Sequence, residues 1–370
     1  MSEKIKKSLM PGRKLKIAVL FGGRSTEHAV SCVSAVSIIK NLDKNKYDIV
    51  PIGITTDGDW LPYSGSTELL PADKWVEPAR AENGFTPVKG KCSLELGIKA
   101  MSGCDCVLPV LHGQNGEDGT VQGLLELMGL PYVGCGIFAS AAGMDKVYTK
   151  LVLEKAGIPQ AEYIVSYRPE ALADPEKYVA AVNASFGFPC FVKPSNSGSS
   201  VGVFKVKTPE ELPEALRGAH KYDRKVLIEE FIDGREIECA VLGNYSNAVA
   251  AAPGEIKPSK EFYDYEDKYE SGASYCVIPA ELPEETMENV RATALKAFAA
   301  LDGTGLSRVD FFCKKDGSIV LNEINTLPGF TEISMYSKLW INAGMTYSAL
   351  LDRLVELAFE RVEENKRCMK

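Results

Sequence analysis

The pattern of apolar and polar positions predicts alternating strands and helices in the first third of the chain. KIAVLFGG (16–23) is an apolar run ending in glycines, residues 25–42 have helical spacing, and YDIVPIGITT (47–56) is again strand-like. CDCVLPVLHG (104–113) resembles another buried strand, and TVQGLLELMG (120–129) is helical. Because strand, helix and strand in succession form a parallel layer, the pattern predicts an N-terminal parallel α/β domain.

From about residue 139 the pattern changes to an α+β type. Residues 140–157 are helical in spacing, and FPCFVKPSNSGSSVGVFKV (188–206) has strand-like runs around a Gly/Ser loop. VLIEEFIDGREIECAVLG (226–243) predicts a hairpin with an Asp-Gly turn. A long helix is expected at about 283–301, and an amphipathic helix near the end of the chain.

Another hairpin is predicted for SRVDFFCKKDGSIVLNEIN (307–325), because its Asp-Gly dipeptide favours a two-residue turn. This turn places Asp310 opposite Glu323. It also places Arg308 opposite Asn325, so these four side chains share one face of the hairpin. The residues expected on the other face, toward the core, are Val309, Phe311, Cys313, Val320 and Ile324.

Two acids placed face to face need an explanation, since like charges directly opposite are destabilising. On a solvent-exposed face the pair of Asp310 and Glu323 would be screened and tolerated. The alternative is a cation: two carboxylates, the amide oxygen of Asn325 and a neighbouring Arg308 suit Mg²⁺, which often joins protein carboxylates to substrate phosphates.

The loop KPSNSGSSVG (193–202) offers backbone N–H groups and hydroxyls to phosphate oxygens. It is neither a Walker A loop nor a G-x-G-x-x-G motif, and such a loop by itself is more often a plain flexible hairpin. Lys146 and Lys193 each interrupt an apolar neighbourhood. They either extend toward solvent or supply charge to an anionic ligand such as ATP.

The edge of IEEF (228–231) and the carboxylate of Glu236 are weaker candidates for adenine and ribose contacts, since they are also ordinary strand residues. His28 and His112 are two of 3 histidines and are interpreted as structural residues. No Ser/His/Asp order stands out. Nucleophilic catalysis by a side chain is therefore not indicated.

Composition restricts the classes of partner. A chain of 370 residues with 45% hydrophobic and 25% charged residues is long enough for two or three globular domains. The net charge of −8 argues against nucleic acid. The 10 cysteines show no disulfide or metal-binding spacing, which indicates reduced thiols in the cytosol. The N-terminus predicts neither a secretory signal nor a membrane span.

Eight motifs occur in the order found in D-alanine–D-alanine ligases of the ATP-grasp superfamily, and the resemblance runs from about residue 15 to 360. The motifs are GGRSTEHAVSCVSA, HGQNGEDG, MDK, FVKPSNSGSSVG, EEFIDGREIE, EFYDYEDKY, SRVDFF and NEINTLPGFT. The resemblance implies an α/β chain with the ATP-grasp fold, in which an N-terminal parallel α/β domain precedes two α+β domains clasping ATP. The expected boundaries are a tail at 1–13 and domains at 14–138, 139–231 and 232–370.

The resemblance also implies an activity: ATP phosphorylates the carboxylate of a first D-alanine, and the amine of a second attacks the acyl phosphate, which yields a peptidoglycan precursor. Two Mg²⁺ (or Mn²⁺) ions are expected on Asp310, Glu323 and Asn325. ATP contacts are expected from Lys146, Lys193, Glu229, Phe231, Ile232 and Glu236. Catalytic roles fall to Glu27, Ser199, Tyr269, Arg308, Gly329 and Lys268, and substrate binding to His112, Ser334 and Met335.

For several of these residues the resemblance implies a particular contact. Glu27 resembles the acid that fixes the first ammonium, and with Ser199 and Tyr269 it resembles a triad that latches the loop over residues 256–276. Arg308 and the N–H of Gly329 are expected to stabilise the tetrahedral oxyanion. The family also implies that Lys268 contacts the γ-phosphate and that His112 lies near the first substrate. Ser334 and Met335 are expected to hold the second carboxylate.

The sequence departs from the family at Ser337, where proline is usual, and at Ala29, where an acid is common. Ligases of the same fold that use D-serine or D-lactate remain alternatives, although Met335 and Tyr269 favour D-alanine. A non-catalytic ATP-binding relative is a more distant alternative. The expected partners are ATP, D-alanine and a second copy of the chain in a cytoplasmic homodimer, with neither nucleic acid nor membrane.

Overall fold

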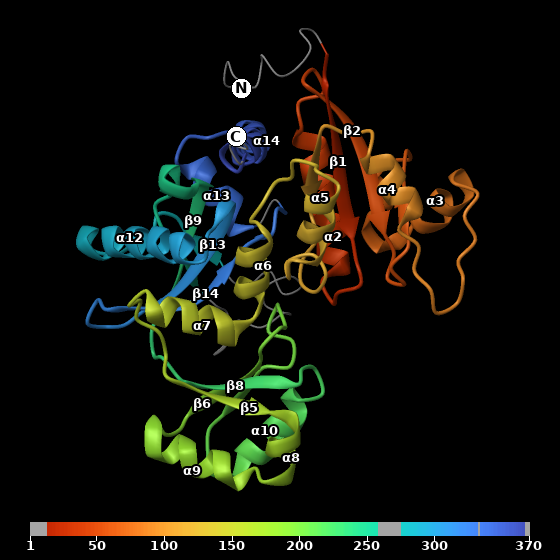
Figure 1. Cartoon of the computed structure of the whole chain (residues 1–370). Coiled ribbons are helices and arrows are strands. Elements are labelled where there is room, and N and C mark those ends of the chain that lie inside the picture. The colour runs from red at the N-terminus through yellow and green to blue at the C-terminus, as the bar shows by residue number, and fades with distance from the viewer. Residues whose placement is uncertain (1–12, 258–274, 332–333, 367–370) are drawn as a thin grey trace.

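The computed structural model describes residues 13–257, 275–331 and 334–366. Within these ranges the chain forms three β-sheets, each with its own helices, and Figure 1 shows them as three bodies. Of the tail expected at 1–13 only Arg13 is described, and its guanidinium lies 2.5 Å from Asp105. None of the described helices has the length and apolar character that crossing a membrane requires.

The N-terminal body is the predicted parallel α/β layer. Its sheet has the order β3-β2-β1-β4, in which β1, β2 and β4 are parallel and β3 is antiparallel to β2. Successive strand residues point to opposite faces, so α2 covers one face while α4 and α5 cover the other. The elements are β1 (Leu15–Gly22), α2 (His28–Asn41), β2 (Tyr47–Ile54), β3 (Trp60–Pro62), 3₁₀ turns at Thr67–Leu69 and Pro71–Asp73, α3 (Val76–Glu82), α4 (Glu95–Met101), β4 (Cys106–Pro109) and α5 (Thr120–Leu127).

The central body is a smaller antiparallel sheet of order β5-β8-β6-β7. Its helices share one apolar core with the sheet, around the fully buried Val192, Leu216 and Ile228. The Gly/Ser loop at 195–203 joins β6 to β7. The elements are β5 (Tyr163–Tyr167), α8 (Arg168–Ala173), α9 (Glu176–Ser185), β6 (Cys190–Pro194), β7 (Phe204–Val206), a 3₁₀ turn at Pro209–Glu211, α10 (Leu212–Ala219) and β8 (Lys225–Glu230).

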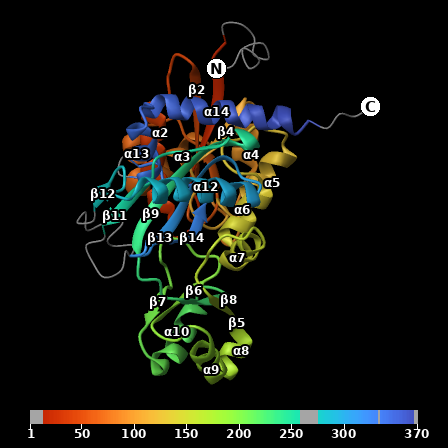
Figure 2. The same ribbon diagram turned by 90° about the vertical axis from the view of Figure 1, so that its left-hand side faces the viewer.

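The C-terminal body is a sheet of order β12-β11-β9-β13-β14, with β10 also paired to β9. Helix α12 shares its core, and Figure 2 shows α14 lying across the top of the molecule. The elements are β9 (Arg235–Asn244), a 3₁₀ turn at Tyr245–Asn247, β10 (Val249–Ala250), β11 (Gly254–Lys257), β12 (Tyr275–Val277), α12 (Glu284–Ala300), β13 (Thr304–Cys313), β14 (Ile319–Asn325), α13 (Met335–Asn342) and α14 (Tyr347–Glu364).

Two helices that precede the central sheet pack elsewhere. Residues of α6 (Ile137–Met144) and α7 (Lys146–Lys155) belong to the core that β9, β13 and β14 share with α12. The core of the central sheet itself begins after these helices. The domain boundaries expected from the sequence stay predictions.

The hairpin predicted for residues 226–243 is wrong. Strand β8 pairs with β5 and β6, whereas β9 pairs with β10, β11 and β13, so the two neighbours in sequence belong to different sheets. The connection passes close to the backbone of β13, because a Cβ at Gly234 would lie 3.0 Å from the carbonyl oxygen of Cys313. The Asp-Gly dipeptide thus marks a crossing between two bodies.

The second hairpin is correct, but its turn is not the two-residue turn that was predicted. Lys314 donates to and faces Ser318 across a three-residue loop in which Gly317 has φ +83°. A β-bulge at Asn322 then adds one residue to β14, and the register between Asp310 and Glu323 is restored. The bulge also reverses the face of Val320, which packs with Ile232 rather than in the sheet core.

A buried arginine ties the last helix to the first body. Arg361 of α14 is 4% exposed, and its guanidinium donates to the carbonyl oxygens of Gly134 at 2.6 Å and Tyr132 at 3.1 Å. It also lies 3.8 Å from the ring centroid of Tyr132 and donates to Thr304. The contact anchors the segment that leads out of the N-terminal domain.

We expect Arg361→Met to lower the free energy of unfolding by about 3 kcal/mol, because it leaves several buried acceptors without a donor. The matched control is Arg353→Met on the same helix, where the side chain is 34% exposed and pairs with Glu356 and Glu360. A change below about 1 kcal/mol is expected there. Urea unfolding of both variants measures the difference, and equal losses would contradict the anchoring role.

Candidate active site

A cavity of about 620 Å³ lies where the three bodies meet. Most of the predicted site residues line it, although they come from distant parts of the chain. Lining residues from the N-terminal body are Glu27 and His112; those from α7 and the central body are Lys146, Lys193, Ser199 and Glu229; those from the C-terminal body are Arg308, Glu323, Asn325, Gly329, Ser334 and Met335.

The remaining predicted residues differ in position. Asp310 is 9% exposed and sits behind the wall, where it accepts a hydrogen bond from Asn325 at 3.0 Å. Ile232 is buried in an apolar cluster, and the ring of Phe231 lies beneath the Lys205 ammonium at 4.5 Å. Glu236 is not among the lining residues. Lys268 and Tyr269, with the lid predicted over 256–276, fall almost wholly outside the described residues.

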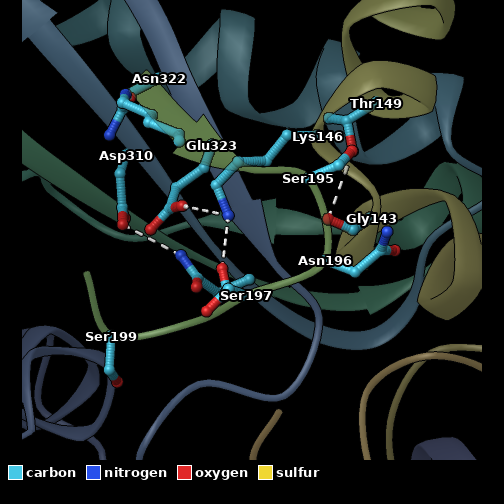
Figure 3. Close-up of polar contacts among 12 residues, drawn as sticks. Gly143, Lys146, Thr149, Ser195, Asn196, Ser197, Ser199, Asp310, Asn322 and Glu323 are labelled. Atoms are coloured by element: carbon cyan, nitrogen blue, oxygen red, sulfur yellow. Dashed lines mark hydrogen bonds and ion pairs between the residues drawn. The ribbon is translucent and has the colours of Figure 1, made fainter. Parts of the chain in front are cut away.

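The acidic row on β13 and β14 forms one wall of the cavity. Asp310 pairs directly with Glu323 across the ladder, as predicted, and Figure 3 shows Glu323 directed toward Lys146, with the two charges 3.9 Å apart. The bulge brings Asn322 onto the same side, where it also lines the cavity. Strict alternation placed Asn322 on the opposite face, and the only signal for the bulge was the change of phase between the apolar Leu321 and Ile324.

The donor set of this wall fits a hard divalent cation. The carboxylate of Glu323 and the amide oxygens of Asn322 and Asn325 line the cavity, with Asp310 beside Glu323 in the ladder, and all four side chains offer the ligand types that Mg²⁺ prefers. The Asn325 amide nitrogen donates to Asp310, which leaves the Asn325 amide oxygen for another partner. Lys146 and Lys193 place positive charge beside these oxygens.

Lys146 is held by a buried network that the sequence did not reveal. Asp145 caps α7 by accepting from the N–H of Val147, and it also accepts from Ser195 at 2.6 Å and from Lys225 at 2.5 Å. Burial alone would raise the pKa of Asp145, but the hydrogen bonds from Lys225 and Ser195 hold it below its usual value. The network joins the start of α7 to the start of the Gly/Ser loop at 195–203.

The orientation of Lys146 follows from this network. Its ammonium donates to the carbonyl oxygen of Ser197 at 2.8 Å, so the lysine and the loop form one unit. Lys225 is 2% exposed and lies 4.1 Å from the ring centroid of Tyr148, with Asp145 as its carboxylate partner.

Lys193 is part of a second buried group of charges. Glu229 is 4% exposed and forms ion pairs with both Lys193 and Lys150, the latter at 2.6 Å. Burial raises the pKa of Glu229, but the two lysines outweigh it and lower this pKa to about 2. The carboxylate is thus a counter-ion, and the Glu229 backbone lies in the ladder between β5 and β6, so this residue is not at the sheet edge that was expected for the adenine contact. Lys150 was missed, although it lies one helical turn after Lys146.

Glu27 bridges two bodies at the far end of the cavity. Its carboxylate accepts a hydrogen bond from Ser199 of the central body, which is the contact that the family resemblance implied. A Cβ at Gly113 or Gly198 would lie 2.8 Å or 2.6 Å from Glu27 Oε2, so both positions need glycine for this approach. Ser199 itself adopts the left-handed region, with φ +48°.

His112 and Glu117 lie beside Glu27. His112 contacts the carbonyl oxygen of Leu327 at 3.2 Å, and its burial lowers its pKa. Glu117 accepts from the N–H of Gly113 at 2.6 Å; burial, and then the charge of Glu27, raise the pKa of Glu117 to about 8. A protonated Glu117 beside Glu27 keeps this end of the cavity from holding two adjacent negative charges. Sequence analysis missed Glu117, although it belongs to the HGQNGEDG motif.

His28 lies outside the cavity, in keeping with its interpretation as a structural residue. Its Nδ1 contacts the carbonyl oxygen of Gly23 at 2.6 Å and its Nε2 contacts Asp73 at 2.7 Å. The ring therefore fastens the end of β1, close to Glu27, to the turn that follows β3.

Two antiparallel sheets that contribute facing charges to one cavity, beside a parallel α/β domain, define the ATP-grasp class of ligases. Residues 16–135 match the family model described as D-ala D-ala ligase N-terminus, and residues 152–356 match D-ala D-ala ligase C-terminus. The chain belongs to the D-alanine–D-alanine ligase family.

The similarity to known relatives extends over nearly the whole chain. The D-alanine–D-alanine ligases of Acetivibrio thermocellus and Ruminiclostridium cellulolyticum are 51% and 52% identical, each over 96% of this chain and 98% of its own length. Among solved structures, the VanG D-Ala:D-Ser ligase of Enterococcus faecalis has a TM-score of 0.79 at 36% identity, covering 94% of this chain and 100% of its own. The D-alanine–D-alanine ligase of Coxiella burnetii has a TM-score of 0.78 at 37% identity, covering 95% of each.

The network around Asp145 yields a prediction for Lys225. We expect Lys225→Met to raise the KM for ATP about tenfold with a smaller effect on kcat, because a hydrogen bond to a charged group is lost while the methionine fills the same volume. Steady-state kinetics with varied ATP provide the measurement. The control is Lys177→Met, an exposed lysine of the same body, which should leave both constants unchanged. An unaltered KM for ATP in Lys225→Met would show that Lys146 is positioned without this network.

Proposed function

We propose that the chain joins two D-alanine molecules to D-alanyl-D-alanine in an ATP- and Mg²⁺-dependent reaction that passes through D-alanyl phosphate. The observation that carries the proposal is the cavity itself, which is lined together by two lysines, by part of the acidic row and by Glu27, an acid suited to an ammonium group. Membership of the ligase family supports the same substrates.

In the first step a carboxylate oxygen of the first D-alanine attacks the γ-phosphorus of ATP, and ADP leaves. Lys146 and Lys193 offset phosphate charge from one side, and the Gly/Ser loop that Lys146 anchors contributes N–H donors. Asp310, Glu323 and Asn325 would hold two Mg²⁺ or Mn²⁺ ions, whose chemistry is to neutralise charge on the transferred group. Glu27 holds the ammonium of the first D-alanine, and His112 lies near its carboxylate.

In the second step the amine of the second D-alanine attacks the acyl carbon, and phosphate leaves after the tetrahedral intermediate collapses. Arg308 and the N–H of Gly329 are the proposed donors to the oxyanion. Ser334 is the N-cap residue of α13, and we propose that this N-terminus, with Met335, receives the second carboxylate. We further propose that Lys268 contacts the γ-phosphate and that Tyr269 joins Glu27 and Ser199, both roles being implied by the family resemblance.

The adenine and ribose contacts that we propose for Glu229, Phe231, Ile232 and Glu236 are likewise implied by the family resemblance. A homodimer in the cytoplasm is also proposed. Exposed apolar side chains at Leu127, Ile137 and Phe138, which are 90%, 44% and 54% exposed, offer a surface for a second copy. Analytical ultracentrifugation tests the dimer.

We expect Glu323→Gln to reduce ligase activity by about a hundredfold or more at low Mg²⁺ while the protein stays folded, because a metal-binding charge is lost from a partly exposed site. Dipeptide formation over a range of Mg²⁺ concentrations, with EDTA as the metal-free reference, is the measurement. The control is Glu363→Gln, which removes an exposed pair with Lys366. Full activity of folded Glu323→Gln at every Mg²⁺ concentration would refute the metal site.

The second substrate is tested by competition, since one structural neighbour is a D-Ala:D-Ser ligase. Met335 is 4% exposed and lines the cavity with an apolar thioether, which suits the methyl group of D-alanine and offers no donor to a hydroxyl. We expect D-alanyl-D-alanine to dominate when D-alanine, D-serine and D-lactate are supplied together with ATP. Mass spectrometry of the products decides, and a majority of D-alanyl-D-serine or of the ester would overturn the substrate assignment.

A further inference from the structure

A third carboxylate extends the acidic row, beyond the positions that the family resemblance implied. Strand β13 lies between β14 and β9, and Asp310 therefore pairs with Glu323 on one side and with Glu238 on the other. Glu238 is 8% exposed and lines the cavity. Three acids in one transverse row repel each other, so their placement requires compensating cations.

Arg308 compensates the part of the row that lies away from Glu323. Its Nε donates to Asp310 Oδ1 at 2.8 Å, its Nη2 donates to Asp310 Oδ2 at 2.7 Å, and the Nε also lies 3.0 Å from Glu238 Oε2. Asp310 thus binds the guanidinium through hydrogen bonds, and Glu238 faces it as a charge partner on the neighbouring strand. The negative charges of Asp310 and Glu238 outweigh burial and keep the Arg308 pKa well above its usual value.

Asp310 and Glu238 interact with different partners once ligands bind. Asp310 occupies Arg308 through both oxygens, yet the proposed function also requires Asp310 to bind a divalent cation. A cation of charge +2 beside Asp310 weakens that carboxylate's attraction for the guanidinium and repels the guanidinium directly. Without a second anion, Arg308 would lose its orientation when the catalytic charges are in place.

Glu238 is placed to supply this second anion, and it lies two strands away from Glu323. Neighbouring strands are about 4.8 Å apart, so Glu238 and Glu323 are separated by roughly 9.6 Å of sheet. Its other neighbour on β11 is Gly254, whose missing side chain leaves room between Glu238 and Met335: a Cβ there would lie 2.9 Å from the Met335 sulfur.

We infer that Glu238 is a positioning residue that keeps Arg308 directed at the reacting acyl group when Asp310 binds metal. The inference rests on the proposed function and adds a residue to it. Glu238 acts through Arg308 and touches neither the phosphates nor the first substrate. The inference also explains the row of three acids. Asp310, in the middle, binds the metal, and Glu238, on the side away from Glu323, orients Arg308.

The test is Glu238→Gln, which keeps the shape of the side chain and removes its charge. We expect kcat for dipeptide formation to fall by about tenfold to a hundredfold, part of the loss that follows removal of an oxyanion donor. The Mg²⁺ concentration for half-maximal activity should stay unchanged. Binding of a phosphinate analogue of the tetrahedral intermediate should weaken in parallel with kcat, whereas binding of ADP should not.

A double-mutant cycle with Arg308→Lys separates action through the arginine from a general effect. If Glu238 works through Arg308, adding Glu238→Gln to Arg308→Lys causes little further loss. Additive losses would overturn the inference. So would wild-type kcat in Glu238→Gln, or a loss that high Mg²⁺ restores, which would make Glu238 a metal ligand.

The matched control is Glu255→Gln on the adjacent strand β11. Glu255 is 1% exposed, pairs with Arg235 and Lys257, and does not line the cavity, so its loss should lower stability without lowering kcat. If Glu238→Gln fails to fold, Glu238→Asp retains the charge at a greater distance and is expected to show a smaller fall in kcat; an unchanged kcat there would count against the inference. Absence of dipeptide formation by the unaltered protein would instead refute the proposed function.

Discussion

Buried charges in this protein need opposite charges close by, and around the cavity these partners come from different strands and bodies. Glu229 on β8 holds Lys193 of the neighbouring strand and Lys150 of α7, and Asp145 at the start of α7 holds Lys225 of the central sheet. An isolated charge in such surroundings costs several kcal/mol, whereas a paired and hydrogen-bonded one is tolerated. The pairs Glu229–Lys150 and Asp145–Lys225 therefore tie α7, which packs in the C-terminal core, to the central sheet.

The same requirement explains how the cavity is prepared for a ligand of high charge. Its cations are already fixed by buried anions or backbone oxygens, so little reorganisation is needed when phosphates arrive. Lys146 bound to Ser197, and Arg308 bound to Glu238 and Asp310, are both examples. Glu117 and Glu27 also lie close together, and there burial and the charge of Glu27 raise the pKa of Glu117, which favours its neutral form. The electrostatics of binding are therefore largely set before any substrate enters.

The errors made from sequence share one physical origin. Local turn chemistry was used to assign strand pairing, but pairing is decided by which backbone edges meet in three dimensions. The Asp-Gly dipeptide at 233–234 separates two sheets, and the one at 316–317 belongs to a longer turn than predicted. The pairing of Asp310 with Glu323 was nevertheless correct, because the additional turn residue and the bulge at Asn322 compensate each other. Side-chain alternation on β14 could not be continued across that bulge, which is why Val320 was assigned to the wrong face.

The sequence by itself determined the parallel N-terminal layer, the presence of the acidic hairpin and the order of the family motifs, because hydrophobic periodicity and motif spacing are local properties. Most of the site residues expected from the sequence line the cavity, although they are fewer than half of its lining residues. Only the tertiary structure decided that helices α6 and α7 pack on the C-terminal sheet, that Lys150 and Lys225 are buried beside acids, and that Glu238 lies beside Arg308. These contacts join residues far apart in the chain or on separate strands, and their energies depend on burial and distance, which no single stretch of sequence contains.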